Sequence, residues 1–163
     1  MMRIFALLFS ALSLSACALQ PLYSGGSQGS VAALLENISV EPIEGKSGWL
    51  VRNALNDRLK ALGSQTPRYR LAVKLEDDIV GLGVRSDDTV TRERRTLRAR
   101  YQLVELASGK TLLDATAGSD AGIDVVSSEY ATIAGENTAL ENLSQKVADQ
   151  IATRLSLYAR AQK

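Results

Sequence analysis

The pattern of apolar and polar positions along the chain predicts a domain that begins with a short strand and a helix. Within residues 34–43, apolar and polar residues alternate as in a half-buried strand. A helix is expected over residues 47–62, because apolar residues recur there at spacings of three and four, with Ser47 as N-cap and Gly63 as C-terminal stop. Trp49 is expected to enter the core at the first turn. The apolar stripe of this helix is expected to consist of Val51, Ala54, Leu55, Leu59 and Leu62.

A long β-hairpin is the next predicted element. Residues 69–75 alternate strictly between apolar and polar, which is typical of a half-buried strand. The acidic run at residues 76–78 interrupts this alternation and predicts a β-bulge, after which the apolar positions resume at Val80 and continue to Val84. The chain is expected to turn at residues 87–88 and to return as a second long strand. The inward residues of that returning strand are expected to be Leu97, Ala99, Tyr101 and Leu103.

A fourth strand and a long helix complete the prediction. Residues 108–110 predict a tight turn, and residues 111–117 return from it as a strand. A looser stretch through Gly118 and Gly122 then leads to the C-terminal helix, for which the serine pair at residues 127–128 offers a start. The apolar stripe of this helix is expected to consist of Leu140, Leu143, Val147, Ile151, Leu155 and Tyr158.

The order of these elements, β-α-β-β-β-α, predicts the topology. The first two strands are joined through a helix, so they are expected to be parallel with a right-handed crossover, whereas the later strands form antiparallel hairpins. Each helix carries one apolar stripe, so both helices are expected on the same face of a four-stranded mixed sheet. The predicted fold class is therefore α+β, in a single α/β domain at residues 34–163.

The first 16 residues predict a cleaved lipoprotein signal peptide. A basic start precedes an apolar run at residues 4–14, which is shorter than the ~20 residues of a membrane-spanning helix. The following Leu-Ser-Ala-Cys at residues 14–17 resembles the lipobox of bacterial lipoproteins, whose cysteine is acylated after cleavage. Cys17 is the predicted lipidation site, and residues 17–33 are expected to form a lipidated tether. By resemblance to the sorting rule of Gram-negative lipoproteins, a residue other than Asp after the lipidated cysteine, here Ala18, favours the outer membrane.

The composition argues against an enzyme. The 163 residues include no His and one Cys, which excludes His-based acid–base catalysis, Cys–His nucleophiles and Cys/His zinc sites. The carboxylates at residues 77–78 and 87–88 match no calcium-loop spacing. The sequence therefore predicts no catalytic residues, no metal and no cofactor. A nucleic-acid partner is not expected either, because the formal net charge is only +1 and the lipobox points to the cell envelope.

Local charge is more informative than the net charge. Residues 46–110 carry fourteen Lys and Arg against eight Asp and Glu, whereas residues 111–145 carry six acids and no base. Because strand side chains alternate, basic residues of the hairpin are expected on the face away from the helices. That face either is simply solvated or contacts an anionic lipid head group or an acidic protein wall. The candidate residues are Arg70, Lys74, Arg94, Arg98 and Arg100.

Several short segments of the chain, taken together, are similar to those of a known family. They are CALQPLY at residues 17–23, RNAL at 52–55, TR at 91–92, YQL at 101–103, SEYA at 128–131 and RL at 154–155. Together they resemble the LPS-assembly lipoprotein family (LptE), especially its alphaproteobacterial branch. The resemblance implies two helices on one face of a four-stranded mixed sheet.

The same resemblance implies a role. A member of this family is expected to be anchored in the outer membrane through acyl chains on the periplasmic side. There it would plug and help assemble an LptD-type outer-membrane β-barrel and assist lipopolysaccharide delivery to the outer leaflet. The alternative is an auxiliary lipoprotein of an ABC-type lipid or solvent export system.

Overall fold

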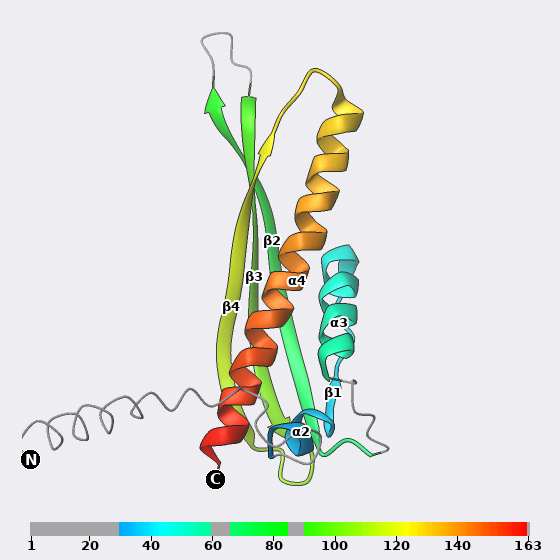
Figure 1. The fold of residues 1–163 in the computed structure, drawn as a ribbon, viewed down its shortest axis with the longest axis vertical. Helices are drawn as coiled ribbons and strands as arrows, with labels where there is room; N and C mark the ends of the chain where they lie inside the picture. The colour runs from blue at the N-terminus through cyan, green and yellow to red at the C-terminus, as the bar shows by residue number, and fades with distance from the viewer. Residues whose placement is uncertain (1–29, 60–65, 85–89, 163) are drawn as a thin grey trace, which may run out of the picture.

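The computed structural model describes residues 30–59, 66–84 and 90–162 (Figure 1). The described elements confirm the α+β class and the four-stranded mixed sheet, and they add one short helix at the start that the sequence pattern did not predict. In chain order they are α2 (Ser30–Leu35), β1 (Ile38–Val40), α3 (Gly45–Leu59), β2 (Tyr69–Val84), β3 (Val90–Glu105), β4 (Thr111–Asp124) and α4 (Glu129–Ala161).

The sheet has the strand order β1-β2-β3-β4. β1 pairs with β2 in parallel, and the other two pairs are antiparallel, as predicted. With 16 residues each, β2 and β3 are about 50 Å long. The 33 residues of α4 give a helix of about the same length, so α4 runs beside the whole hairpin and the molecule is elongated (Figure 1).

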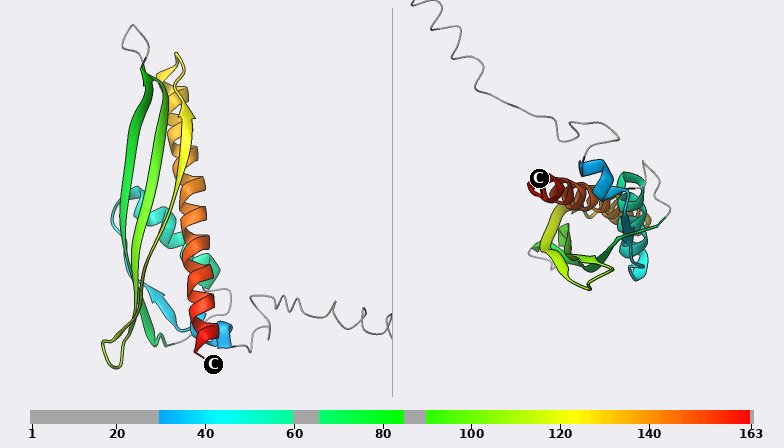
Figure 2. Two further views of the ribbon diagram at one scale, coloured as in Figure 1. Left: turned by 90° about the vertical axis from the view of Figure 1, so that its left-hand side faces the viewer. Right: turned by 90° about the horizontal axis from the view of Figure 1, so that it is seen from below.

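The core lies between one face of the curved sheet and the helices (Figure 2). α3 and α4 run side by side in the same direction, with Lys46 beside Asn137 at one end (2.5 Å) and Arg58 beside Asp149 at the other (2.6 Å). The predicted inward residues of β3 are all buried, and so is the predicted stripe of α4 except for Tyr158, which is half-buried. Both helices therefore cover the same face of the sheet, as the two stripes predict.

Trp49 is not in the core: its side chain is 63% exposed, so that prediction is wrong. α3 begins at Gly45, two residues before the predicted start, and its inward positions include Gly48 rather than Trp49. Gly48 packs so closely that a Cβ there would lie 2.5 Å from the carbonyl oxygen of Ile43. Residues three positions apart lie on the same face of a helix, so Gly48 shares the buried face of Val51. Trp49, one position further along, therefore lies on the exposed face.

The predicted bulge at residues 76–78 is absent from the β2–β3 pairing, which continues without a shift through Glu76, Asp77 and Asp78. Val80 consequently points away from the helices and is 58% exposed, whereas Asp77 points toward them. The irregularity in the sheet lies elsewhere, between Leu103 and Val104 where β3 pairs with β4.

Two further boundaries differ from the sequence prediction. Residues 30–33 were expected in the tether but belong to α2, where Val31 and Ala32 are buried. The predicted loose stretch after residue 117 is instead the second half of β4, which pairs with β3 as far as Asp124. At the start of α4 the prediction is confirmed, because the Ser128 side chain accepts a hydrogen bond from the backbone N–H of Ala131.

Some sequence predictions concern residues outside the described ranges. They are the signal peptide, the lipidated Cys17, most of the tether, the helix end at residues 62–63 and the turn at residues 87–88. Among the helices of the described ranges, none has the length and apolarity that crossing a bilayer requires.

Candidate functional site

The outer face of the sheet, turned away from the helices, carries the five predicted basic residues. Arg70 and Lys74 stand on β2, and Arg94, Arg98 and Arg100 stand on β3. All five side chains are exposed, and Lys74 lies directly opposite Arg100 across the two strands. The alternation of strand side chains thus places these residues together, as the sequence predicts.

Acidic residues of β4 share this outer face, which the sequence pattern did not reveal. The pairing sets Asp114 opposite Gln102, Asp120 opposite Thr96 and Asp124 opposite Arg92. A row of bases on β3 therefore runs beside a row of acids on β4. The outer face carries both signs of charge along its length and is not a purely basic surface.

Several bases of the outer face are already ion-paired. Arg92 contacts Asp124 at 3.0 Å, and Arg70 contacts Glu41, which follows β1, at 3.1 Å. These pairs are well exposed, so each stabilises the fold only weakly.

Asp114 is the most strongly perturbed carboxylate of the outer face. Arg100 donates from Nε and Nη2 to its two oxygens at 3.2 and 2.9 Å, and Gln102 donates a further hydrogen bond at 2.8 Å. The hydrogen bonds from Arg100 and then Gln102 lower the pKa of Asp114 to about 2. The same contact raises the pKa of Arg100 above its usual value. Asp114 therefore stays ionised and holds Arg100 across the β3–β4 pair.

Three bases of the outer face remain open to a partner. Lys74 and Arg94 form no ion pair with another residue that the structure describes. Arg98 donates from Nη1 to the backbone carbonyl of Ser119 at 3.2 Å and lies over Gly118, where a Cβ would come within 2.5 Å of its Cδ. These three residues are the part of the predicted site that can still bind an anion.

A second charged cluster lies on the inner face and was missed from the sequence. Arg95 donates from Nε and Nη2 to the two carboxylate oxygens of Asp77, each at 2.8 Å, and from Nη1 to the backbone carbonyl of Glu136 at 3.0 Å. Its side chain is 12% exposed and that of Asp77 is 19% exposed. The hydrogen bonds that Arg95 donates to the Asp77 carboxylate raise the pKa of Arg95 despite its burial. The cluster links β2, β3 and α4. From the sequence, Asp77 could have been placed on the inner face only by continuing the strand alternation without a break through residues 76–78.

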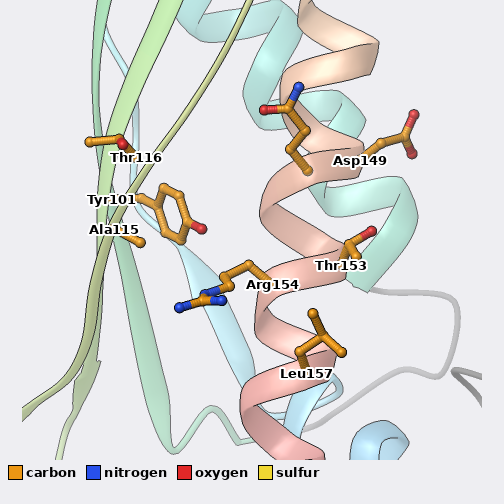
Figure 3. Close-up of a pocket in the computed structure, with 8 residues that line it drawn as sticks. Tyr101, Ala115, Thr116, Asp149, Thr153, Arg154 and Leu157 are labelled. Atoms are coloured by element: carbon orange, nitrogen blue, oxygen red, sulfur yellow. The ribbon is translucent and has the colours of Figure 1, made fainter.

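A cleft runs between β4 and α4. Its lower part, of about 640 Å³, is lined by Tyr101, Ala115 and Thr116 of the sheet and by Thr153, Arg154 and Leu157 of the helix (Figure 3). The side chain of Arg154 extends from α4 toward the strands (Figure 3). Burial raises the pKa of the Tyr101 hydroxyl above its ordinary value. An upper part of about 730 Å³ continues along the same helix face between residues 121–124 and 135–146.

The described residues hold no metal-ligand cluster, and two serine hydroxyls of α4 are bonded within the helix. Within residues 30–59, 66–84 and 90–162, no three carboxylate, Cys or His groups gather closely enough to hold a metal ion. The hydroxyls of Ser144 and Ser156 on α4 are buried and donate to backbone carbonyls one turn earlier. They therefore belong to the helix structure and are not exposed nucleophiles.

The chain is similar to known proteins in sequence and in fold. The family model LptE, described as lipopolysaccharide-assembly, matches residues 35–155. A lipoprotein candidate from Caulobacter crescentus has a TM-score of 0.66 at 20% identity, covering 81% of this chain and 98% of that one. Rare lipoprotein B from Shewanella oneidensis has a TM-score of 0.59 at 11% identity, with 78% and 98% covered. A minor lipoprotein from Acinetobacter baumannii has a TM-score of 0.57 at 16% identity, with 76% and 94% covered. At these identities the likeness concerns the fold, and no curated protein matches the sequence.

Proposed function

The chain belongs to the LptE family of lipopolysaccharide-assembly proteins, and we propose that it plugs and helps assemble an LptD-type outer-membrane β-barrel. In that place it assists delivery of lipopolysaccharide to the outer leaflet. The family is non-enzymatic, which agrees with the expectation of a non-enzyme. The alternative of an auxiliary lipoprotein in an ABC-type export system is not favoured, because the matching family model is one of lipopolysaccharide assembly.

The shape and surface of the sheet carry this proposal. The hairpin and α4 are each about 50 Å long, which is close to the ~40–45 Å of a bilayer with its head groups. The outer face exposes charged side chains of both signs along that length. The interior of a transmembrane β-barrel is polar, so a rod with a polar face fits it better than it fits the bilayer.

The lipid anchor is part of the same proposal. Acylation of Cys17 would hold the protein on the periplasmic side of the outer membrane, and several acyl chains anchor far more firmly than one. The first described element, α2, lies at the end of the molecule where α4 ends (Figure 1). The tether would therefore attach at that end, leaving the far end of the β2–β3 hairpin free to enter the barrel.

Purification from membranes tests the barrel partnership. Outer membranes that contain the tagged full-length protein are solubilised in mild detergent, and we expect an integral β-barrel to co-purify in stoichiometric amount. A lipoprotein fused to the same tag serves as the control for non-specific capture. Recovery of the protein as a free monomer, with no barrel in any fraction, would argue decisively against the proposed function.

The outer face is proposed to contact the phosphates of lipopolysaccharide or an acidic wall of the barrel. Lys74, Arg94 and Arg98 are the bases involved, because they have no carboxylate partner among the described residues. Arginine matches phosphate and carboxylate geometry well. Lys74 and Arg100 also line a small depression of about 160 Å³ with Ala72 and Gln102, in which an anionic group can lie.

Replacing these three bases tests the outer face. The triple variant Lys74→Ala, Arg94→Ala, Arg98→Ala should melt like the wild type, since all three side chains are exposed. Binding to lipopolysaccharide or to the barrel should weaken about tenfold or more, as three lost charged contacts imply. The matched control is Arg70→Ala, on the same face but paired with Glu41. If the triple variant binds both partners as the wild type does, the outer face is simply solvated.

A further inference from the structure

β4 is an edge strand of the sheet, and its outer edge turns toward α4. At Gly118 the backbone N–H and C=O do not point to β3: the N–H donates to Gln150 Oε1 (3.0 Å), and the C=O accepts from Gln150 Nε2 (3.1 Å). In an antiparallel pair this direction alternates from one residue to the next. The backbone groups of Thr116, Asp120 and Gly122 therefore also point outward.

Those outward groups are free along most of the edge. No hydrogen bond on that side joins Thr116, Asp120 or Gly122 to another residue within the described parts of the chain. At Gly118 the side-chain amide of Gln150 supplies one donor and one acceptor, as the peptide group of a neighbouring strand would. Gln150 thus occupies one position of an absent fifth strand.

The cleft leaves room for such a strand on both sides of Gln150. Its two parts, of about 640 and 730 Å³, follow the same seam between β4 and α4 below and above this residue. Three of the lining residues of β4 are small, namely Ala115, Ala121 and Gly122. On α4 they recur at spacings of three and four, as one helix face requires: Gly135, Thr138, Asn142, Lys146, Gln150, Thr153 and Leu157.

We propose that an extended segment of the barrel partner pairs with the outer edge of β4 and displaces the side chain of Gln150 from Gly118. The inference rests on the proposed function, because it names the surface through which the barrel is held. Main-chain hydrogen bonds supply the binding in this mode, and side chains supply the selectivity.

The lower cleft indicates which side chains the segment carries. Tyr101 and Leu157 offer an apolar wall, and Leu157 is 45% exposed in the free protein. Arg154 reaches into the same space and forms no ion pair with another described residue (Figure 3). A segment with an apolar side chain followed by an Asp or Glu satisfies both, because the carboxylate that also lines this space, Asp149, is already paired with Arg58 at 2.6 Å.

A proline placed on the edge tests the backbone pairing. Thr116→Pro removes an outward N–H but no hydrogen bond to β3, so an edge strand tolerates it. The matched control is Thr116→Val, which keeps the N–H. In co-purification with the full-length tagged protein, the Thr116→Pro variant should bring down at least about tenfold less barrel than the Thr116→Val variant. The two variants should have similar melting temperatures. Equal recovery of barrel by the two variants would overturn the inference.

Gln150→Ala and amide exchange separate edge pairing from a structural role. Because the variant opens Gly118, it should bind the barrel more tightly than the wild type, although the free protein loses two hydrogen bonds. In the complex, the amides of Thr116, Asp120 and Gly122 should exchange far more slowly than in the free protein. Unchanged exchange at these amides, or pairing of β4 with β4 in a second copy of this chain, would overturn the proposed occupant. If the wild type captures no barrel at all, the proposed function itself has failed.

Discussion

Asp77 lies in an acidic run that looks like surface, yet its carboxylate is held by Arg95 inside the helix-covered side of the sheet. Asp78, the next residue, is exposed on the opposite face. Neighbouring residues of equal charge thus have different roles, because successive strand side chains point to opposite faces.

Removing the Asp77 carboxylate should destabilise the protein. Asp77→Ala leaves the mostly buried guanidinium of Arg95 with only the Glu136 carbonyl, which we expect to cost about 1–3 kcal/mol in the free energy of unfolding. Asp78→Ala is the matched control and should cost less than about 0.5 kcal/mol. Urea unfolding of the full-length protein in detergent measures both. A similar midpoint for the two variants would show that the cluster contributes little.

Asp114 predicts a pH dependence with a definite sign. Its pKa in the folded protein is about 2, which lies below the ordinary value, so its ionised form stabilises the fold. This contribution is complete above about pH 5 and disappears as the pH falls toward 2. An NMR titration of the Asp114 side chain should show this low midpoint. In Arg100→Gln the midpoint should move up toward the ordinary value, and an unmoved midpoint would contradict the role given to Arg100.

At the scale of elements, α3 and α4 differ in how tightly a glycine of each helix packs against its neighbours. α3 packs through Gly48, where a Cβ would lie 2.5 and 2.7 Å from the oxygen and carbon of the Ile43 carbonyl. α4 contains Gly135, where a Cβ would meet only Ile123 Cγ2 at 3.4 Å. The first contact is with backbone, which cannot move away easily, whereas the second is an ordinary van der Waals contact.

The same substitution in the two helices should therefore have opposite effects. Gly135→Ala should stabilise the protein by up to about 1 kcal/mol, because alanine favours a helix interior and restricts the unfolded chain. Gly48→Ala should lower the melting temperature, since α3 must shift away from residue 43 to accept the methyl group. Thermal unfolding followed by circular dichroism compares them. Equal shifts in melting temperature would show that the approach of α3 is not tight.

At the scale of the whole molecule, the fold and the anchor are separable. The buried core is built from α2, the strands, α3 and α4, and it includes no residue before Val31 among those described. The anchor predicted at Cys17 would then decide where the protein resides without deciding whether it folds.

Replacing the cysteine tests this separation. In Cys17→Ser the protein should leave the membrane fraction while its domain melts as before, because the serine oxygen cannot form the thioether-linked anchor. Mass spectrometry of the N-terminal peptide of the wild type should show acyl groups on Cys17. An unmodified thiol at Cys17 would contradict the lipoprotein prediction.

Local patterns in the sequence determined which elements form. The strict alternation of residues 69–75, the spacing of Leu140, Leu143 and Val147, and the cap at Ser128 each follow from the geometry of a single strand or helix. A β-α-β start followed by hairpins then allows few topologies, so the mixed sheet with its helices on one face was predictable. The basic residues of β2 and β3 could be assigned to the outer face for the same reason.

Only the tertiary structure decided what lies beside each element. The continuous β2–β3 register through residues 76–78 placed Asp77 on the helix-covered face. The pairing of β3 with β4 set acidic residues beside the arginines. The close packing of α3 at Gly48 left Trp49 on the exposed side of the helix. The pairing of Gln150 with Gly118 joins residues 32 positions apart. Such contacts depend on how whole elements fit against one another, and the side-chain pattern within a single element does not encode that fit.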